Sequence, residues 1–327
     1  MMTDFSEIGV VVLGGGPDRE RAVSLASAGA VFDALRGTGR FREVTYLEID
    51  RLSQEELRGI EGDLFFPVLH GSWGEGGPLQ ELLEKDGRPF VGSGSESARV
   101  AMDKLRSIAV ARALGIDVAD SYEFDVFDDG GLRIACPVVV KPIDDGSSVN
   151  IFICETIDEF DEAVRIIREG ITGRDGKRPR YMVERYVAGR ELTVSVVGHA
   201  VSSIIEIIPQ HGFYDYDAKY ERDDTCYIVN PDLPDGVREY LCESSLRLFD
   251  EIGARDLARV DYRYDGEEGG EFESGYGCYF LEINTMPGFT GHSLLPMGAK
   301  REQGWDMGEL CCRLVGFAAA RSSIPSH

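Results

Sequence analysis

The chain has 327 residues, with 43% hydrophobic and 28% charged side chains, which is enough for two or three packed domains. Its formal net charge is −24, and a surface of that sign repels DNA, RNA and anionic membranes, so nucleic-acid and membrane partners are not expected. No apolar run reaches the roughly 20 residues of a membrane span.

The first hundred residues alternate short apolar strands with helical stretches. Apolar runs at residues 8–13, 44–49 and 64–69 are typical of strands, whereas residues 22–35 and 79–84 have helical character. This alternation predicts a parallel sheet covered by helices. A single helix is expected from about residue 96 to residue 114, where Gly115 ends it, and it would lead into the next part of the chain.

The middle of the chain predicts strands at 137–141, 151–154 and 181–184 and a helix at 157–168. The apolar face of that helix is expected to consist of Ile157, Phe160, Ala163, Val164 and Ile167. The last part predicts strands at 192–197, 202–208, 258–264 and 278–283 and helices at 237–252 and 307–321. A long polar and aromatic loop, residues 209–227, follows the second of these strands.

Seven cysteines are scattered along the chain without a CxxC pair or a Cys/His zinc spacing. We therefore expect free thiols and a reducing, cytoplasmic location. The first residues have no basic region before their apolar stretch and no small-residue cleavage site, so a signal peptide is not expected.

Two glycine-rich strings follow strands in the first part. In LGGGPDRERAVSL the glycines could bring backbone N–H groups close to an anion, although a tight strand-to-helix turn accounts for them equally well. In LHGSWGEGGPLQ, His70 ends a strand of the expected parallel sheet, where ligands collect. His70 is therefore either a site residue or a hydrogen-bonded structural histidine.

Two further strings carry lysines beside flexible segments. VVVKPIDDGSSVN places Lys141 at the end of an apolar strand, before a Gly-Ser-Ser loop that is not a Walker loop. The lysine and the loop N–H groups could bind a phosphate, or the segment could be a hairpin with a flexible tip. HGFYDYDAKY contains Lys219 and Tyr220, and is either a lid over a site or a small satellite core.

The most informative pattern lies in two strands near the C-terminus. Arg259 and Asp261 alternate in LARVDYRY, and Glu282 and Asn284 alternate in YFLEINTMPG, so each pair points to one face of its strand. Charges in such apolar strands need compensation. Oxygen ligands to Mg²⁺ beside a phosphate-binding arginine would provide it, and we favour this reading over an ion pair between Arg259 and a carboxylate.

Taken together, these strings resemble the D-alanine–D-alanine ligase family of the ATP-grasp fold over nearly the whole chain. The matching strings follow the family's order: LGGGPDRERAVSL, LHGSWGEGGPLQ, GSGSESARVAMDKLRS, VVVKPIDDGSSV, YDYDAKY, RVDY and LEINTMPGFTGHSLLP. The resemblance implies an α/β fold of three domains: a Rossmann-like parallel-sheet domain at 1–102, a central ATP-grasp domain at 103–185 and a C-terminal catalytic domain at 186–327. ATP would bind between the last two.

The resemblance also implies how ATP is held. Three lysines are expected to contact its phosphates, namely Lys104, Lys141 and Lys219. Ser148 would lie in a loop that covers the phosphates. The adenine would bind the hinge from Glu184 to Val187, and the ribose would bind Glu191.

For the substrates, the resemblance implies that Glu20 holds the ammonium group of the first amino acid and is linked through Ser147 and Tyr220 to a closing loop. His70 would lie beside the substrate. The carboxylate of the second amino acid is expected at Ser293 and Leu294.

The same resemblance implies three metal ligands, Asp261, Glu282 and Asn284, for two Mg²⁺ ions that Mn²⁺ could replace. Arg259 and the backbone of Gly288 would stabilise the tetrahedral intermediate. The implied reaction joins two D-alanines through a D-alanyl phosphate, for a peptidoglycan precursor, in an enzyme that forms homodimers. Tyr220 favours a dipeptide over an ester of D-lactate.

The chain departs from the family pattern at Ala22, Gly76, Asn150 and Gly291, which leaves the second substrate less defined than the reaction. A ligase of another pair, such as D-Ala–D-Ser or a pair from an antibiotic pathway, is the related alternative. A dinucleotide-binding oxidoreductase and a non-catalytic nucleotide-binding regulator are alternatives from other classes. The oxidoreductase would use the LGGG turn but would not account for Asp261, Glu282 and Asn284.

Overall fold

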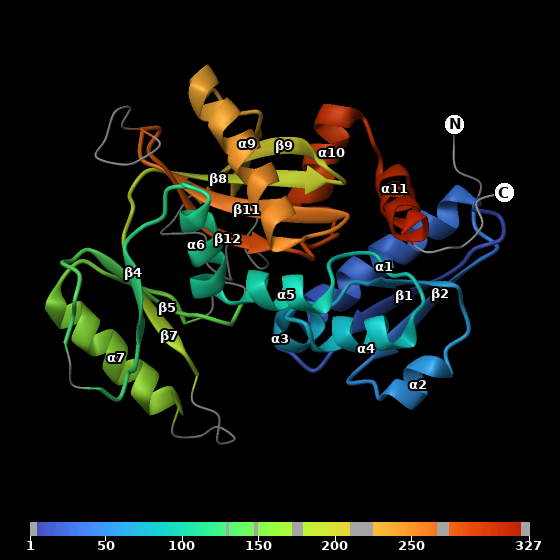
Figure 1. The fold of residues 1–327 in the computed structure, drawn as a ribbon, viewed down its shortest axis with the longest axis horizontal. Coiled ribbons are helices and arrows are strands. Elements are labelled where there is room, and N and C mark those ends of the chain that lie inside the picture. The colour runs from blue at the N-terminus through green and yellow to red at the C-terminus, as the bar shows by residue number, and fades with distance from the viewer. Residues whose placement is uncertain are drawn as a thin grey trace.

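The computed structural model describes residues 5–128, 131–146, 150–171, 179–209, 225–266 and 275–321. Within them the chain forms one parallel sheet and two antiparallel sheets, with helices packed against each (Figure 1). The three sheets follow one another along the chain and lie around a common centre, where the residues predicted to form a site come together.

The parallel sheet is formed by the first part of the chain. Its central strand β1 (Gly9–Gly15) lies between β2 (Glu43–Ile49) and β3 (Leu64–Pro67). Every residue of β1 is buried, as the continuous apolar run GVVVLGG requires for a strand covered on both faces. Helix α1 (Arg21–Thr38) connects β1 to β2, α2 (Gln54–Arg58) connects β2 to β3, and α3 (Gly71–Gly74) and α4 (Pro78–Asp86) follow β3. The predicted parallel sheet is confirmed.

The middle of the chain forms a four-stranded sheet in the order β4-β7-β5-β6. Its strands are β4 (Ser121–Phe124), β5 (Val138–Pro142), β6 (Phe152–Cys154) and β7 (Tyr181–Arg185). Helix α7 (Ile157–Ile171) covers one face and buries the predicted apolar residues Phe160, Ala163, Val164 and Ile167. The prediction was wrong for Ile157, which is 63% exposed because it begins the helix, ahead of the turns that reach the core.

The last part forms a five-stranded antiparallel sheet in the order β10-β9-β8-β11-β12. Its strands are β8 (Arg190–Val197), β9 (Ala200–Ile208), β10 (Cys226–Val229), β11 (Leu257–Tyr264) and β12 (Cys278–Asn284). The register pairs Asp261 with Glu282 and Arg259 with Asn284. Helix α9 (Asp235–Ile252) packs against this sheet, and α10 (Leu294–Gln303) and α11 (Met307–Ala320) complete the chain.

One predicted helix is divided in two. The sequence favoured a single helix over residues 96–114, but the structure has α5 (Ser95–Met102) and α6 (Lys104–Ala113), separated by Asp103 in an extended conformation. The Asp103 side chain caps α6 by accepting the backbone N–H of Arg106 at 3.0 Å, and it also pairs with Arg180 at 2.7 Å. These contacts turn the chain at Asp103, so that Lys104 begins a new helix.

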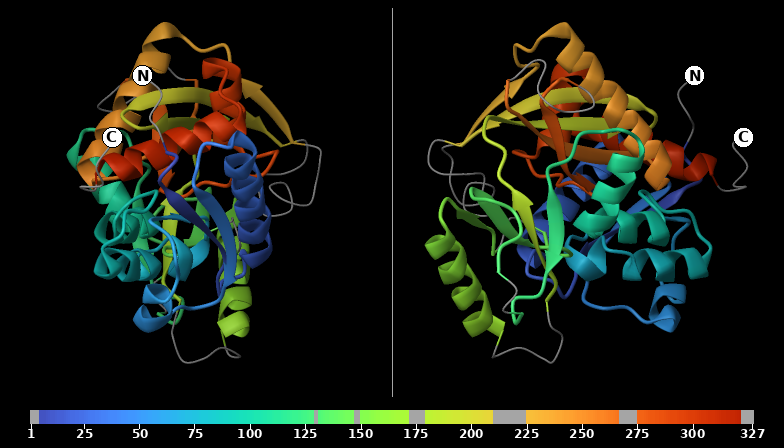
Figure 2. Two further views of the ribbon diagram at one scale, coloured as in Figure 1. Left: turned by 90° about the vertical axis from the view of Figure 1, so that its right-hand side faces the viewer. Right: turned by 60° about the vertical axis from the view of Figure 1, so that its left-hand side comes forward.

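The C-terminal helix α11 packs on the parallel sheet. Its residues Leu310, Cys311 and Leu314 share a core with Val12 of β1 and Val31 of α1. Figure 2 shows α11 lying across α1, far from the four-stranded sheet. The first and last parts of the chain therefore form one packed unit, and the loop between β12 and α10 is held between them.

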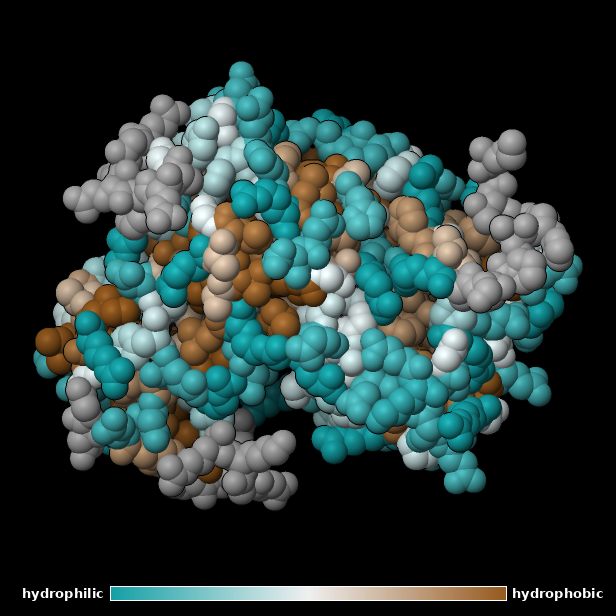
Figure 3. All heavy atoms as spheres, in the orientation of Figure 1, coloured by the Kyte–Doolittle hydropathy of each residue, from teal (hydrophilic) through white to brown (hydrophobic). Residues whose placement is uncertain are grey.

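None of the helices in the described part of the chain is long and apolar enough to span a bilayer. The face shown in Figure 3 is largely hydrophilic at its edges, with apolar residues gathered near its centre. All seven cysteines lie within the described residues and are free thiols, as the sequence predicted.

Candidate functional site

Two cavities contain every described residue that the sequence marked for a site. The first, which we call the inter-sheet cleft, lies between the four-stranded and five-stranded sheets. It contains seven predicted residues: Lys104, Lys141, Glu184, Val187, Glu191, Asp261 and Glu282. Apolar side chains from both sheets, Val139, Ile153 and Leu281, lie among further charged and polar ones. A cavity lined by both apolar and charged side chains suits a nucleotide, whose base is flat and whose phosphates are anionic.

A buried ion pair spans the floor of the inter-sheet cleft. Lys141 on β5 donates to Glu184 Oε2 on the neighbouring strand β7 at 2.7 Å, and both side chains are less than 9% exposed. The other oxygen, Glu184 Oε1, is buried and has no hydrogen-bond partner among the described residues. Because a buried acceptor without a donor is costly, this oxygen suits a ligand that carries an N–H group.

Lys104 enters the cleft because α6 begins at that residue. Its backbone N–H donates to Ile143 O at 3.1 Å, which ties α6 to the end of β5. Its Nζ donates to Asp145 O at 2.8 Å and lies 3.4 Å from Glu282 Oε2. A cation is therefore held between the loop after β5 and strand β12, at the polar end of the cleft.

Arg259 and Asp261 form the ion pair that the sequence left open as an alternative. Arg259 Nε and Nη2 each donate to one Asp261 oxygen at 2.9 Å, and the Thr193 hydroxyl donates to Asp261 Oδ1 at 2.6 Å. Asp261 is buried, and this bidentate geometry orients its carboxylate and the guanidinium together. Asp261 lines the inter-sheet cleft, and Arg259 lines the second cavity, which is described below.

The predicted metal ligands gather at the edge of β11 and β12. Asp261 and Glu282 are paired across the two strands, and Asn284 follows on the same face of β12. Among the described residues, no three His, Cys, Asp or Glu side chains form a metal cluster. The set is instead two carboxylates and one amide, all oxygen donors, which fits a hard cation that takes its remaining ligands from phosphate oxygens and water.

The second cavity, which we call the loop pocket, is formed by loops and helix ends. It contains eight predicted residues: Glu20, His70, Arg259, Glu282, Asn284, Gly288, Ser293 and Leu294. Glu20 precedes α1, His70 precedes α3, and Ser293 precedes α10. The pocket therefore brings together segments that are more than two hundred residues apart in the sequence.

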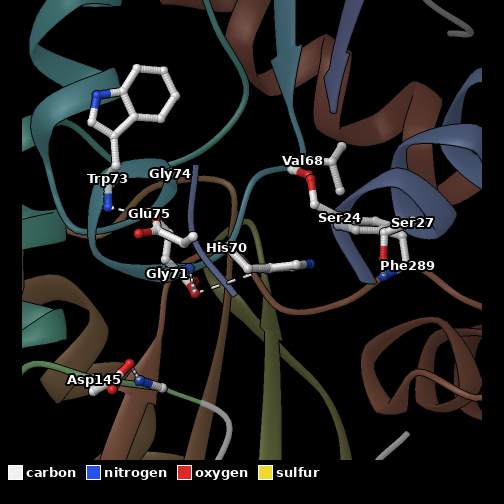
Figure 4. Close-up of polar contacts among 12 residues, drawn as sticks. Ser24, Ser27, Val68, His70, Gly71, Trp73, Gly74, Glu75, Asp145 and Phe289 are labelled. Atoms are coloured by element: carbon white, nitrogen blue, oxygen red, sulfur yellow. Dashed lines mark hydrogen bonds and ion pairs between the residues drawn. The ribbon is translucent and has the colours of Figure 1, made fainter. Parts of the chain in front are cut away.

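The parallel sheet holds the first wall of the loop pocket through side chain–backbone hydrogen bonds (Figure 4). Ser24 of α1 accepts the N–H of Gly15 at 2.9 Å and donates to Val68 O at 2.5 Å, two residues before His70. Asp18 accepts the N–H of Trp73 at 2.9 Å and so satisfies a free donor in α3. Glu20 and His70 consequently project from a well-anchored strand end.

Burial strongly perturbs two groups in this wall. Burial, with a smaller contribution from the nearby Arg259, lowers the pKa of His70 to about 4, although a hydrogen bond with the Met286 backbone opposes the shift. Burial and the neighbouring Glu20 raise the pKa of Glu75 well above its usual range. The 3.9 Å contact between His70 Nδ1 and Glu75 Oε1 is therefore not a pair of full charges at neutral pH. The pocket holds several carboxylates around Arg259, which suits a ligand carrying a positive charge.

The two cavities meet at Gly146 and Glu282, which line both. A Cβ atom at Gly146 would lie 3.1 Å from Glu20 Oε1, so the loop after β5 passes directly beside the Glu20 carboxylate. A group bound at the polar end of the inter-sheet cleft can therefore contact a group bound in the loop pocket.

Several contributors were missed from the sequence. Glu75 lies in the string LHGSWGEGGPLQ, five residues after His70, and its place as the carboxylate of a glycine-rich loop was the signal that could have marked it. Thr193 had no local signal, because only the β8–β11 register places it against Asp261. Four predicted site residues lie outside the described residues: Ser147, Ser148, Lys219 and Tyr220.

Comparisons with known proteins agree with this geometry. The family model described as D-ala D-ala ligase C-terminus matches residues 115–316. A D-alanine–D-alanine ligase from Sinorhizobium fredii is 36% identical over 312 residues, 95% of this chain and 97% of the relative. The structure of the Bacillus anthracis D-alanine–D-alanine ligase complexed with ATP has a TM-score of 0.76, is 25% identical, and covers 96% of this chain and 98% of that chain. A D-Ala:D-Ser ligase from Enterococcus faecalis also has a TM-score of 0.76; it is 26% identical, and the match covers 96% of this chain and 100% of that chain. The predicted ATP-grasp fold is confirmed.

Proposed function

The chain belongs to the D-alanine–D-alanine ligase family, and from this premise we propose that it joins two D-alanines into D-alanyl-D-alanine while ATP is converted to ADP and phosphate. The observation that carries the proposal is the meeting of the two cavities at Gly146 and Glu282. An acyl-phosphate has to form where the γ-phosphate of ATP touches the carboxylate of an amino acid, and this junction brings the two together. Family membership excludes the oxidoreductase alternative.

ATP binds in the inter-sheet cleft. Its adenine lies against the segment from Glu184 to Val187, where the free oxygen Glu184 Oε1 accepts the exocyclic amino group. Glu191 binds the ribose at the open end of the cleft, beside Arg263 at 3.6 Å. Lys104 binds the phosphates, and Lys141, which is 2.7 Å from Glu184, reaches them from beside the adenine. The family resemblance assigns Lys219 and Ser148 to the phosphates as well. The geometry of the cleft supports the roles of the described residues, whereas the roles of Lys219 and Ser148 rest on the family resemblance.

In the first step, a carboxylate oxygen of the first D-alanine attacks the γ-phosphorus, and the bond to the β-phosphate oxygen breaks to release ADP. The lysines offset the negative charge that builds up on the transferring group. Asp261, Glu282 and Asn284 would hold Mg²⁺, with Mn²⁺ as a substitute, and the ion would act as a Lewis acid on the phosphate oxygens. Glu20 binds the ammonium group of the first D-alanine, with Ser147 and Tyr220 completing its anchoring.

In the second step, the amine of the second D-alanine attacks the acyl carbon and phosphate leaves. Arg259 and the backbone N–H of Gly288 stabilise the oxyanion of the tetrahedral intermediate, because both line the loop pocket. Ser293 and Leu294, at the start of α10, bind the carboxylate of the second substrate through backbone and hydroxyl donors. His70, neutral at physiological pH, packs beside the substrates without adding charge.

The setting of the reaction follows from the same premise. We propose the three-domain division at residues 102 and 185, a homodimer formed through the N-terminal region, and a cytoplasmic location, where ATP is available. The product would serve as a peptidoglycan precursor, since the family supplies that dipeptide.

The test measures ADP and phosphate release from ATP and Mg²⁺ with D-alanine, L-alanine, D-serine or D-lactate, and identifies products by mass. We expect release that depends on D-alanine and yields the dipeptide. Preference for D-serine as second substrate would make the chain a D-Ala–D-Ser ligase and would keep the mechanism. Absence of ADP release with every one of these substrates would refute the proposed function.

A further inference from the structure

Helix α1 reaches the loop between β12 and α10 through a single buried hydroxyl. Ser27 Oγ accepts the backbone N–H of Phe289 at 3.1 Å, across 262 positions of sequence, and both residues are fully buried (Figure 4). This hydrogen bond joins the first part of the chain to the wall of the loop pocket. Its acceptor lies seven residues after Glu20, on the same helix.

The Phe289 side chain is held as firmly as its amide. Its ring packs edge-on against Phe66 of β3 with centroids 5.7 Å apart. On the other side, the N–H of Thr290 donates to Ser293 Oγ at 2.9 Å, which closes the turn before α10. Phe289 is therefore fixed on the parallel sheet, directly after Gly288.

The backbone at Gly288 passes close to the start of α10. A Cβ atom there would lie 2.8 Å from Ser293 Oγ, so a larger residue would displace the hydroxyl that closes the turn before α10. A glycine backbone can rotate more freely than any other, which is a disadvantage for a group that must point at one atom. Ser27 holds the Phe289 N–H, and so fixes the peptide unit that follows Gly288 and limits where the Gly288 Cα can lie.

We propose that Ser27 is a positioning residue that holds the backbone next to Gly288 in the wall of the loop pocket, so that the Gly288 N–H meets the oxyanion of the second step. The inference rests on the proposed function, in which Gly288 stabilises that oxyanion. Gly288 lines the loop pocket and not the inter-sheet cleft, so Ser27 acts through it on amide formation and not on the binding of ATP. Loss of the hydroxyl leaves the D-alanyl phosphate forming normally but slows its capture by the amine, so more of it is lost to water.

The test compares Ser27→Ala with the unaltered chain by the ratio of ADP released to dipeptide formed. We expect the turnover number for dipeptide to fall about tenfold to a hundredfold, the KM for ATP to stay within about twofold, and the ratio to rise at least about threefold. Ser27→Thr keeps the acceptor oxygen and is expected to restore the ratio. Hydrogen exchange of residues 286–293 should accelerate in Ser27→Ala but not in Ser27→Thr.

Ser245→Ala is the matched control, because Ser245 is an equally buried serine on helix α9 whose hydroxyl partner, Tyr262, lines neither cavity. It should lower thermal stability and leave the ratio unchanged. An unchanged ratio in Ser27→Ala, or an equal rise in both variants, would overturn the positioning role. If Ser27→Ala does not fold, Ser27→Cys retains the size with a weaker acceptor and is read in the same way. Failure of the unaltered chain to make any dipeptide would refute the proposed function itself.

Discussion

The inter-sheet cleft and the loop pocket take their charged side chains from different kinds of structural element. The cleft takes its charged groups from neighbouring strands and helix α6, and these groups are already paired: Lys141 with Glu184 at 2.7 Å, and Lys104 with Asp145 O at 2.8 Å. Strand register sets the separation of such side chains, so the cleft is ordered without its ligand.

The loop pocket takes its groups from strand ends, turns and helix starts. Here carboxylates are close to one another, and the proximity of Glu20 contributes to the raised pKa of Glu75. His70 Nε2 is buried without a hydrogen-bond partner among the described residues. The pocket is thus incomplete by itself, and a zwitterionic substrate supplies the charges and donors that it needs.

This difference in charge pairing explains how one chain can bind two kinds of ligand. A nucleotide is large and binds to a rigid, pre-paired frame, whereas two small amino acids need a pocket whose electrostatics they complete. Four substitutions test this comparison of the two cavities, and they follow in order of decreasing expected effect.

Glu282→Gln is expected to have the largest effect, because Glu282 lines both cavities. Loss of its charge removes a proposed metal ligand, and we expect the rate of ADP release at saturating substrates to fall at least about 10³-fold. The control is Glu123→Gln, an exposed strand carboxylate paired with Arg180 outside the cavities. Activity within tenfold of the unaltered chain would show that Glu282 holds no essential ion.

Lys141→Met tests the pre-paired character of the inter-sheet cleft. It leaves Glu184 charged and buried without its partner, and we expect the free energy of unfolding to fall by about 4 kcal/mol. The double variant Lys141→Met with Glu184→Gln should recover most of that stability but not ATP binding. Thermal unfolding and an ATP titration measure the two effects, and a stable single variant would contradict the buried-pair argument.

His70→Gln tests the electrostatics of the loop pocket. The pKa of His70 is about 4 in the fold and about 6.5 in the unfolded chain, so between these values the unfolded state binds the extra proton. Stability from neutral His70 is present above pH 6.5 and is lost as the pH falls toward 4, by about 3 kcal/mol. Between pH 7 and pH 4, the free energy of unfolding should fall more steeply in the unaltered chain than in His70→Gln. Equal slopes would show that His70 titrates normally.

Thr193→Val is expected to have the smallest effect. It removes the 2.6 Å hydrogen bond to Asp261 Oδ1 but leaves the two bonds from Arg259. One lost hydrogen bond to a charged group costs about 1.5 kcal/mol, so ATP-dependent activity should fall roughly tenfold. Steady-state kinetics measure this effect. The control is Ser244→Ala on α9, which removes a buried hydroxyl that is bonded to Tyr262 and lines neither cavity. An effect as large as that of Glu282→Gln would mean that Thr193 does more than orient Asp261.

Local patterns in the sequence were sufficient for the elements and for the charged faces of the strands. Period-two spacing correctly placed Arg259 with Asp261, and Glu282 with Asn284, because alternation along a strand depends only on neighbouring residues. Helical spacing likewise identified the inner face of α7. The ordered family strings then marked residues that the structure gathers into the two cavities, although their individual roles stay predictions.

Tertiary contacts decided what no local pattern encodes. The break at Asp103 depends on Arg180 and on the Ile143 carbonyl, and without it Lys104 would continue a helix instead of beginning one. The perturbed charges of His70 and Glu75 depend on burial, which exists only once the parallel sheet and the β12–α10 loop pack together. The hydrogen bond between Ser27 and Phe289 joins segments 262 residues apart, so only the packing of the whole fold brings its two atoms together.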